Sequence, residues 1–172
     1  SSNLSFSAKI GVIPIEGAIM DSQAITEQLR QFEKDKGIKA IILRINSPGG
    51  AVGPTQEIYR EVQRTAENKK VIASLGGVAA SGGYYIAAAA KKIVANPGTI
   101  TGSIGVLMEF VGFEELLNKI GIKLEVLKSG EFKDTGSPYR KLTARDKELI
   151  SALIADIQKQ FVEAVASGRN LS

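Results

Sequence analysis

Hydrophobic and polar positions along the first half of the chain follow a pattern typical of strands that alternate with helices. Two short runs rich in branched apolar residues, 9–15 and 39–45, are predicted to be strands, and the second is apolar enough to be buried on both faces of a sheet. Each run is followed by a segment whose apolar residues recur every three or four positions, as on one face of a helix. The pattern therefore predicts strand, helix, strand, helix.

The same alternation continues through the rest of the chain. We expect helices at 22–34, 54–67, 81–91, 113–120 and 143–166, and further strands at 71–75, 92–95, 105–110 and 123–127. The last helix opens on Thr143 and Asp146, which resemble a capping box. Repeated units of this kind predict an α/β protein with right-handed crossovers and a mainly parallel sheet.

Length and composition predict one globular domain over 1–172. The chain has 172 residues, 44% of them hydrophobic, which is enough to bury a proper core. Its 22 basic and 18 acidic residues are interspersed, without a basic run or an aromatic platform, so we expect no nucleic-acid partner. No apolar stretch approaches the roughly 20 residues that span a bilayer, and the first residues show no signal-peptide pattern. We expect the chain to be a soluble part of a longer protein.

Ser81 is the most informative single residue. It lies in the sequence Gly-Gly-Val-Ala-Ala-Ser-Gly-Gly, where a predicted strand gives way to a helix. Small neighbours leave the hydroxyl unshielded and a helix N-terminus favours developing negative charge, so Ser81 is a candidate nucleophile. A helix-capping serine is the alternative, since serine is a common N-cap residue.

The chain contains no histidine and no cysteine, which restricts the chemistry that Ser81 is able to support. A Ser-His-Asp triad, a Cys-His pair and a His-ligated metal are excluded within this chain. An enzyme built on Ser81 needs another base, and lysine is the obvious candidate. We expect no cofactor and no metal.

A second glycine-rich turn, Asn46-Ser47-Pro48-Gly49-Gly50, follows the second predicted strand. Ligands bind at this edge of open α/β sheets, and glycines let backbone N–H groups approach a substrate closely. Both turns follow parallel-type strands, so the N–H groups of Gly50 and Gly82 are expected to converge as an oxyanion hole. An ordinary strand-to-helix turn is the alternative, because Pro-Gly-Gly is common in turns.

Two lysines in the loop after the last predicted strand are candidate bases. Lys91 and Lys92 are excluded because they lie about 15 Å from Ser81 along the predicted helix, at about 1.5 Å per residue. Lys133 is our choice, and Lys128 is the runner-up because it continues the alternation of the preceding strand. A lysine base must be largely neutral near pH 7, which requires an enclosed site among apolar groups. A solvated loop lysine is the alternative for Lys133.

Four motifs follow one another along the chain: Asn46-Ser47-Pro48-Gly49-Gly50, Ala80-Ser81-Gly82-Gly83-Tyr84-Tyr85, Thr101-Gly102-Ser103-Ile104-Gly105-Val106 and Lys128-Ser129-Gly130-Glu131-Phe132-Lys133-Asp134. In order and approximate spacing they resemble the signal peptide peptidase A family, of the short single-domain kind. The resemblance covers essentially the whole chain. It implies the α/β fold of ClpP and crotonase, with repeated ββα and βαβ units.

The resemblance also implies a role for each candidate residue. The family pattern puts the nucleophile at Ser81, the base at Lys133, the oxyanion donors at Gly50 and Gly82, and a hydroxyl that orients the lysine at Ser103. For Ser103, ordinary turn chemistry is the alternative. The implied enzyme is a serine endopeptidase with a Ser/Lys dyad.

Members of this family are anchored in the cell membrane by an N-terminal helix, act on its extracytoplasmic side and degrade cleaved signal peptides. Short members form closed rings in which serine and lysine come from adjacent protomers. We therefore expect hydrophobic peptides as substrates and a homo-oligomer with shared sites. The membrane anchor is expected to precede this chain, and a further α/β segment is expected to follow it.

Two other functions share parts of this pattern. A crotonase-like acyl-CoA enzyme has the same fold and also holds an oxyanion with backbone amides, but its usual acidic residues have no evident counterpart at the glycine-rich positions here. A non-catalytic membrane scaffold keeps the fold without the chemistry. The presence of both Ser81 and Lys133 argues against the scaffold.

Overall fold

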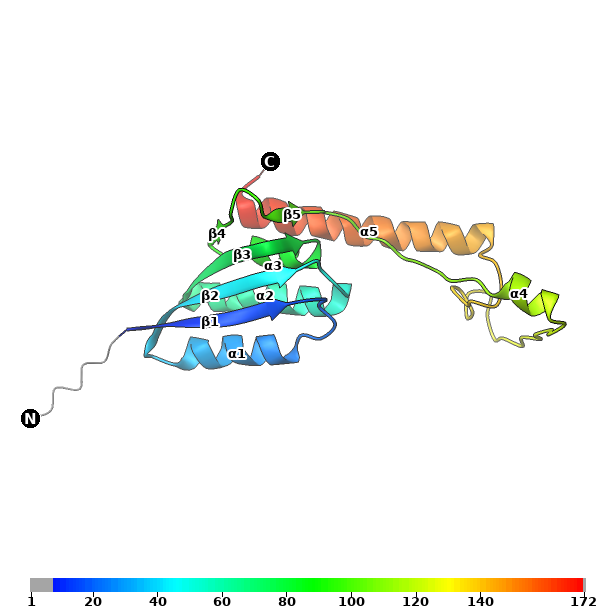
Figure 1. The fold of residues 1–172 in the computed structure, drawn as a ribbon, viewed down its shortest axis with the longest axis horizontal. Coiled ribbons are helices and arrows are strands. Elements are labelled where there is room, and N and C mark those ends of the chain that lie inside the picture. Colours follow the sequence, from blue (N-terminus) through cyan, green and yellow to red (C-terminus); the bar gives the residue numbers. More distant parts are fainter. Residues whose placement is uncertain (1–7, 172) are drawn as a thin grey trace, which may run out of the picture. The chain divides into compact units, whose positions relative to one another are not determined.

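The computed structural model describes residues 8–171 (Figure 1). Its strands are β1 (Lys9–Glu16), β2 (Ile38–Ser47), β3 (Lys70–Ala80), β4 (Lys92–Val94) and β5 (Ile100–Gly102). Its helices are α1 (Gln23–Lys34), α2 (Val52–Asn68), α3 (Gly82–Ala88), α4 (Glu114–Lys119) and α5 (Ala144–Arg169). Strand and helix alternate from β1 to α3, as the hydrophobic pattern predicts.

The described residues group into two compact units. The first comprises 8–105 together with 160–171, and it holds the five strands and the helices α1 to α3. The second is Val106–Lys159, which holds α4 and the larger part of α5. One peptidase domain over 1–172 stays a prediction.

All strand pairs of the first unit are parallel. β1, β2, β3 and β4 are neighbours in that order, and β5 pairs with β3 as well. β4 pairs with β3 at Ile72–Ser74, whereas β5 pairs with the last residues of β3, Val78–Ala80. The predicted α/β fold with a mainly parallel sheet is confirmed.

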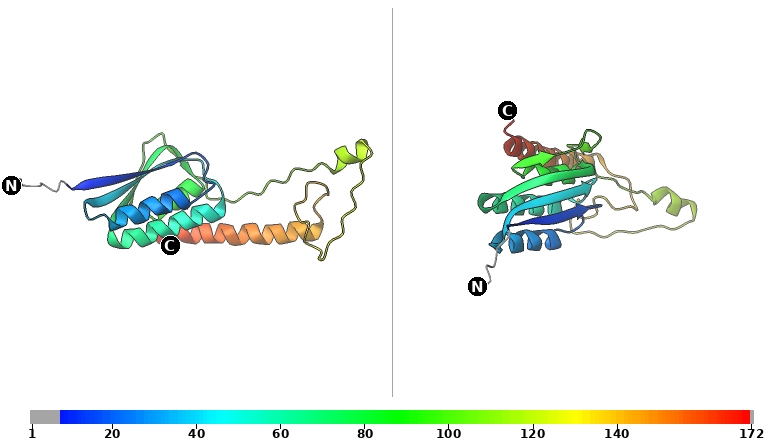
Figure 2. Two further views of the ribbon diagram at one scale, coloured as in Figure 1. Left: turned by 90° about the horizontal axis from the view of Figure 1, so that it is seen from below. Right: turned by 60° about the vertical axis from the view of Figure 1, so that its left-hand side comes forward.

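The core lies between the sheet and the helices α1, α2 and α3, which cover one of its faces (Figures 1 and 2). Ile13, Leu43 and Ala73 are neighbours in register across β1, β2 and β3, and all three are fully buried. This alternation of buried and exposed positions sets which residues of each strand face the helices.

The opposite face of the sheet is open to solvent within the described residues. Ile10 is 62% exposed and Val12 is 54% exposed, although both are large and apolar. Arg44 of β2 is also exposed, and its guanidinium donates to the Ser74 hydroxyl of β3 (3.1 Å). The expectation that β2 is buried on both faces is wrong, because no described helix covers this second face.

The C-terminal part of α5 packs against α2 and α3 in the first unit. Tyr85 of α3 contacts Tyr59 of α2 with ring centroids 4.9 Å apart, and Phe161 of α5 with centroids 4.7 Å apart. Near the end of α5, Arg169 Nη1 donates to the Ala90 carbonyl (2.8 Å). α5 is 26 residues long, yet within residues 8–171 neither it nor any other helix is apolar enough to cross a bilayer.

Two predicted strands, 105–110 and 123–127, do not form in the described structure. Both segments run without strand pairing, on either side of the predicted helix α4. Large apolar side chains in them are exposed, up to 77% at Leu107 and 93% at Leu127. A strand needs a neighbour for its backbone hydrogen bonds, and no described segment supplies one.

Replacing Phe161 by alanine is expected to lower the free energy of unfolding by about 3 kcal/mol, because a buried aromatic side chain is lost and a cavity remains. Phe161 is 4% exposed, whereas its neighbour Val162 is 49% exposed. Val162→Ala is the matched control and is expected to change stability by less than about 0.5 kcal/mol. Urea denaturation measures both, and equal losses would contradict this description of α5.

Candidate active site

Ser81 forms a tight turn of one residue between β3 and α3. Its backbone has φ 50° and ψ −121°, a region that non-glycine residues rarely adopt. A strained strand-to-helix turn of this kind exposes the nucleophilic serine in α/β hydrolases. The Ser81 side chain makes no capping hydrogen bond to α3. Ser81 therefore stands at the N-cap position of α3 without capping the helix through its side chain, and its role as nucleophile stays a prediction.

The turn 46–50 packs directly against Ser81. A Cβ atom added to Gly49 would lie 2.8 Å from the Gly82 nitrogen and 3.0 Å from Ser81 Oγ. Gly49 also has φ 105°, which favours glycine. At Gly83, an added Cβ atom would lie 2.9 Å from the Ser47 carbonyl oxygen. The structure thus brings the two glycine-rich turns together, as the sequence predicts.

The backbone N–H groups of Gly50 and Gly82 have no recorded acceptor among residues 8–171. On either side of Gly50 the N–H groups are engaged: Gly49 donates to Ser47 Oγ (3.1 Å) and Ala51 donates to the Ile19 carbonyl (2.8 Å). Gly82 begins α3, where the first N–H groups of a helix have no partner within the helix. Both are available donors, and their role as an oxyanion hole stays a prediction.

Three polar residues outside the predicted catalytic set support these turns. Ser47 is fully buried, and Asn46 Oδ1 accepts a hydrogen bond from the Val78 N–H (3.2 Å). Thr55 of α2 lies so close to Gly82 that an added Cβ atom would be 2.6 Å from Thr55 Oγ1. The sequence offers one hint for Asn46 and Ser47: they are polar residues directly after a strand that is predicted to be buried.

Ser103 lies close to Ser81 through the pairing of β5 with β3. The Ser81 N–H donates to the carbonyl of Gly102 (2.8 Å), the residue before Ser103. Ser103 also has a positive φ, 52°, and its side chain is exposed. This placement is compatible with a role beside Ser81, and the lysine-orienting role stays a prediction.

Lys133 belongs to the second unit, in the loop between α4 and α5. It is exposed, and no hydrogen bond or ion pair of its ammonium group is recorded among residues 8–171. The expectation that this lysine is enclosed by apolar groups is therefore not met within the chain itself. Lys128, the runner-up, is engaged: its Nζ donates to Asp134 Oδ1 (2.7 Å) and to the Glu131 carbonyl (2.9 Å).

Asp134 and Asp146 form the centre of an ion-pair cluster in the second unit. Arg140 donates to both oxygens of Asp134 (2.9 Å each) and also binds Asp146. Hydrogen bonds from Arg140 and then from Lys128 hold the pKa of the Asp134 carboxyl well below its usual range. Arg140, followed by the Thr135 hydroxyl, does the same to the pKa of Asp146. Both carboxylates are thus fully charged at neutral pH.

The predicted capping box at the start of α5 is part of this cluster. The Thr143 N–H donates to Asp146 Oδ2 (2.9 Å), and the Asp146 N–H donates to Thr143 Oγ1 (3.0 Å). These reciprocal bonds satisfy two backbone donors at the helix start. The capping-box prediction is confirmed.

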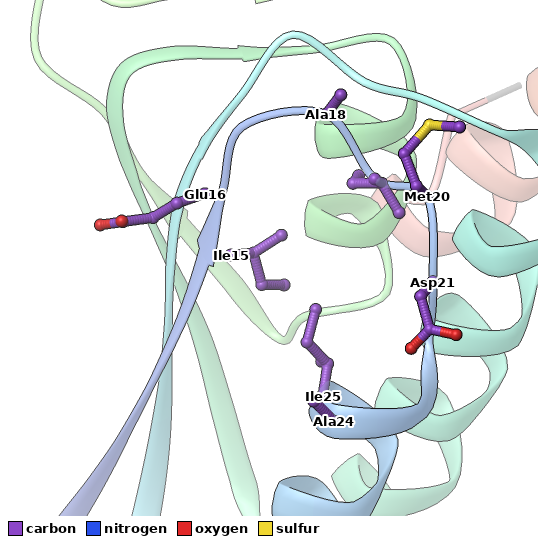
Figure 3. Close-up of a pocket in the computed structure, with 8 residues that line it drawn as sticks. Ile15, Glu16, Ala18, Met20, Asp21, Ala24 and Ile25 are labelled. Carbon is purple, nitrogen blue, oxygen red and sulfur yellow. The ribbon is translucent and has the colours of Figure 1, made fainter.

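A pocket of about 290 Å³ opens between the end of β1 and the start of α1 (Figure 3). Ile15, Met20 and Ile25 are among the apolar side chains that line it, and the acids Glu16 and Asp21 border it. Ile19 also lines the pocket, and its backbone pairs with Gly50. The pocket is therefore next to the turn 46–50. None of the candidate catalytic residues lines it.

The fold is that of ClpP-like α/β peptidases. Its features are the parallel sheet, the strained Ser81 at the carboxyl edge of the sheet and the two glycine-rich turns that meet there. A family model for Clp protease matches residues 5–99. The model of peptidase family S49 matches residues 63–172, well over half of the chain. The chain belongs to peptidase family S49, and its relatives include proteins named SppA.

Three relatives illustrate the match. A Synechocystis sp. protein named as a candidate protease is 45% identical over 166 residues, which are 95% of this chain and 60% of that protein. A candidate signal peptide peptidase SppA of Enterococcus faecium is 36% identical over 150 residues, 87% of this chain and 44% of that protein. The chloroplastic serine protease SPPA of Arabidopsis thaliana is 36% identical over 162 residues, 94% of this chain and 24% of that protein. The chain thus spans only part of each relative.

Gly49→Ala is expected to slow the labelling of Ser81 by a fluorophosphonate at least about tenfold, because the added methyl group displaces the Ser81 turn and strains φ at position 49. Gly53→Ala in the first turn of α2 is the matched control. A Cβ atom there meets nothing within 4 Å, so labelling should keep its rate. Mass spectrometry of the labelled peptide measures both rates. Equal rates for the two variants would contradict the close approach described above.

Proposed function

We propose that this chain is the peptidase domain of a serine endopeptidase that uses Ser81 as nucleophile and Lys133 as general base. The observation that carries the proposal is the strained turn at Ser81, packed against a second glycine turn with free N–H donors. Strain of this kind persists only where the surrounding structure imposes it, and it is concentrated at functional sites. Membership of peptidase family S49 supports the same conclusion.

In the proposed reaction, neutral Lys133 accepts the Ser81 hydroxyl proton while Oγ forms a bond to the scissile carbonyl carbon. The N–H groups of Gly50 and Gly82 donate to the oxyanion that develops. Protonated Lys133 then donates to the leaving amine, so the C–N bond breaks and an acyl-enzyme ester remains. Water, deprotonated by the neutral lysine, attacks the ester and releases the acid and Ser81. Ser103 orients the lysine.

The proposed substrates are extended, apolar peptides such as cleaved signal peptides. The name of the Enterococcus faecium relative, signal peptide peptidase, supports this substrate class. An extended peptide pairs its backbone with the unpaired segment 105–110 that follows Ser103, where main-chain hydrogen bonds supply affinity and shallow pockets select side chains. The apolar lining of the nearby pocket fits side chains of this kind (Figure 3).

The proposed working state is a ring of identical subunits in which Ser81 of one subunit meets Lys133 of the next. The unpaired segments 105–110 and 123–127 expose large apolar side chains that a second copy is suited to cover. A neighbouring subunit also supplies the enclosed environment that Lys133 lacks within this chain. The proposal includes an anchor in the cell membrane and a catalytic domain on the extracytoplasmic side.

Ser81→Ala and Lys133→Ala are each expected to abolish hydrolysis of an apolar fluorogenic peptide, because one removes the nucleophile and the other removes the base. Circular dichroism should show the fold unchanged, since both side chains are outside the core. Lys141→Ala, which removes another lysine of the same unit, is the matched control and should retain most of the activity. Near-normal turnover in Lys133→Ala together with loss in Lys128→Ala would show that the base is misassigned.

Mixing inactive Ser81→Ala and Lys133→Ala proteins under conditions that exchange subunits is expected to restore part of the activity. Some interfaces then pair an intact serine with an intact lysine. Native mass spectrometry confirms the exchange. If subunits exchange and no activity returns, while a dilute monomer of the unchanged protein still hydrolyses the peptide, the dyad lies within one subunit.

The alternative functions make different predictions in the same assays. A crotonase-like acyl-CoA enzyme would turn over thioesters and leave peptides intact. A non-catalytic scaffold would show neither hydrolysis nor labelling of Ser81 by a fluorophosphonate. Labelling that depends on Lys133 is the result that separates the peptidase from both.

A further inference from the structure

Two carboxylates flank Lys133 in the sequence, and neither is recorded in a pair with it. Glu131 lies two residues before Lys133, and Asp134 directly follows it. In the structure, Arg145 at the start of α5 binds Glu131 (3.3 Å), and Lys128 and Arg140 both bind Asp134. Three other cations therefore occupy the two anionic groups nearest to Lys133 along the chain.

The Asp134 side chain is fixed by more than one contact. Arg140 binds it through Nε and Nη2, at 2.9 Å each, which is the forked geometry that suits a carboxylate best. The same guanidinium binds Asp146, which is 1% exposed and also accepts a hydrogen bond from Thr135 Oγ1 (2.6 Å). Asp146 is thus a buried anchor, and Arg140 connects it to the residue beside Lys133.

The arrangement matters because it affects the charge of Lys133. A carboxylate within about 4–6 Å of a lysine favours the ammonium form, which is unable to accept a proton. An Asp134 side chain free to turn toward Lys133 would keep that lysine charged. With Lys128 and Arg140 bound to it, Asp134 is both neutralised and directed elsewhere.

Two acidic groups of α4 are paired with another lysine of the second unit. On α4, Glu115 binds the Lys141 ammonium (2.7 Å), and Glu114 accepts the Lys141 backbone N–H (3.0 Å). Arg145 also lies over the Phe132 ring, with its guanidinium carbon 5.6 Å from the ring centre. Within 128–141, Lys133 is the lysine whose ammonium group has no partner among residues 8–171.

We propose that Lys128, Arg140 and Arg145 are positioning residues that bind the two carboxylates beside Lys133 and so leave this lysine without a counter-ion. The inference rests on the proposed role of Lys133 as the base. It also gives Lys128 a function other than the one for which it was a candidate, because Lys128 acts on Asp134 and not on Ser81. Arg140 contributes most, since it alone joins Asp134 to the buried Asp146.

The test measures the charge of Lys133 in two independent ways in the assembled protein. One is the midpoint of the rise in peptide hydrolysis between neutral and alkaline pH. The other is the pH midpoint of Lys133 acetylation by acetic anhydride, quantified by peptide mass spectrometry, which needs no catalysis. Arg140→Gln is expected to move both midpoints upward by about half a pH unit or more, because Asp134 is then free to pair with Lys133.

Two further variants make this result specific. Arg140→Gln combined with Asp134→Asn should return both midpoints to the original value or below, since the released carboxylate is gone. Lys141→Met removes a cation of the same unit that binds α4 instead, and it should leave both midpoints unchanged. Lys128→Met keeps the Arg140 anchor and is the milder substitute if Arg140→Gln fails to fold.

Each outcome has a distinct meaning. A lower rate at every pH with unchanged midpoints would show that Arg140 supports only the loop structure, and it would overturn the positioning inference. If the acetylation midpoint moves and the hydrolysis midpoint does not, the positioning of charge is real and the proposed base is wrong. If both midpoints move and the double variant restores them, the inference is supported together with the base.

Discussion

The pairing of β3 on both sides of its last residues is the constraint on which the candidate active site depends. Ala79 of β3 pairs with Ser47 of β2, and on the other side the residues next to Ser81 pair with β5. A strained backbone persists only when its surroundings leave no relaxed alternative. Because strands hold both flanks and α3 starts immediately after, the conformation of Ser81 is imposed by the sheet and not by its own preference.

The same constraint explains the glycines around Ser81. Two parallel strands that end side by side bring their following turns closer than side chains permit, so Gly49, Gly82 and Gly83 are sterically required. The backbone N–H groups of Gly50 and Gly82 are left without an acceptor within residues 8–171 in this packing. Close packing of the two turns therefore also leaves backbone N–H groups available as hydrogen-bond donors.

Much of this was predictable from the sequence, and the exceptions have physical reasons. The order of elements from β1 to α3 follows from the hydrophobic period, but β3 continues through Gly76 and Gly77 to Ala80, whereas the pattern predicts a strand that ends at 75. Pairing with β5 and the Asn46 side chain extends the strand there, and no local pattern shows such contacts. The opposite error concerns 123–127, whose alternation is strand-like although no described neighbour pairs with it. Alternation at Lys128 likewise suggested an inward position, whereas a nearby carboxylate determined where its ammonium lies.

The short length of α3 has a mechanical consequence for the candidate nucleophile Ser81. A helix of seven residues is only about 10 Å long, too short to bend, so it transmits displacement of one end to the other. Its far end is held by α5: Arg169 binds the Ala90 carbonyl, and a Cβ atom at Gly168 would lie 2.1 Å from the Ala88 oxygen. The C-terminal turn of α5 therefore holds the end of α3 that lies opposite Ser81. Residues more than eighty positions later in the chain thus contact the helix that begins next to Ser81, and sequence distance from the serine is a poor guide to which substitutions disturb it.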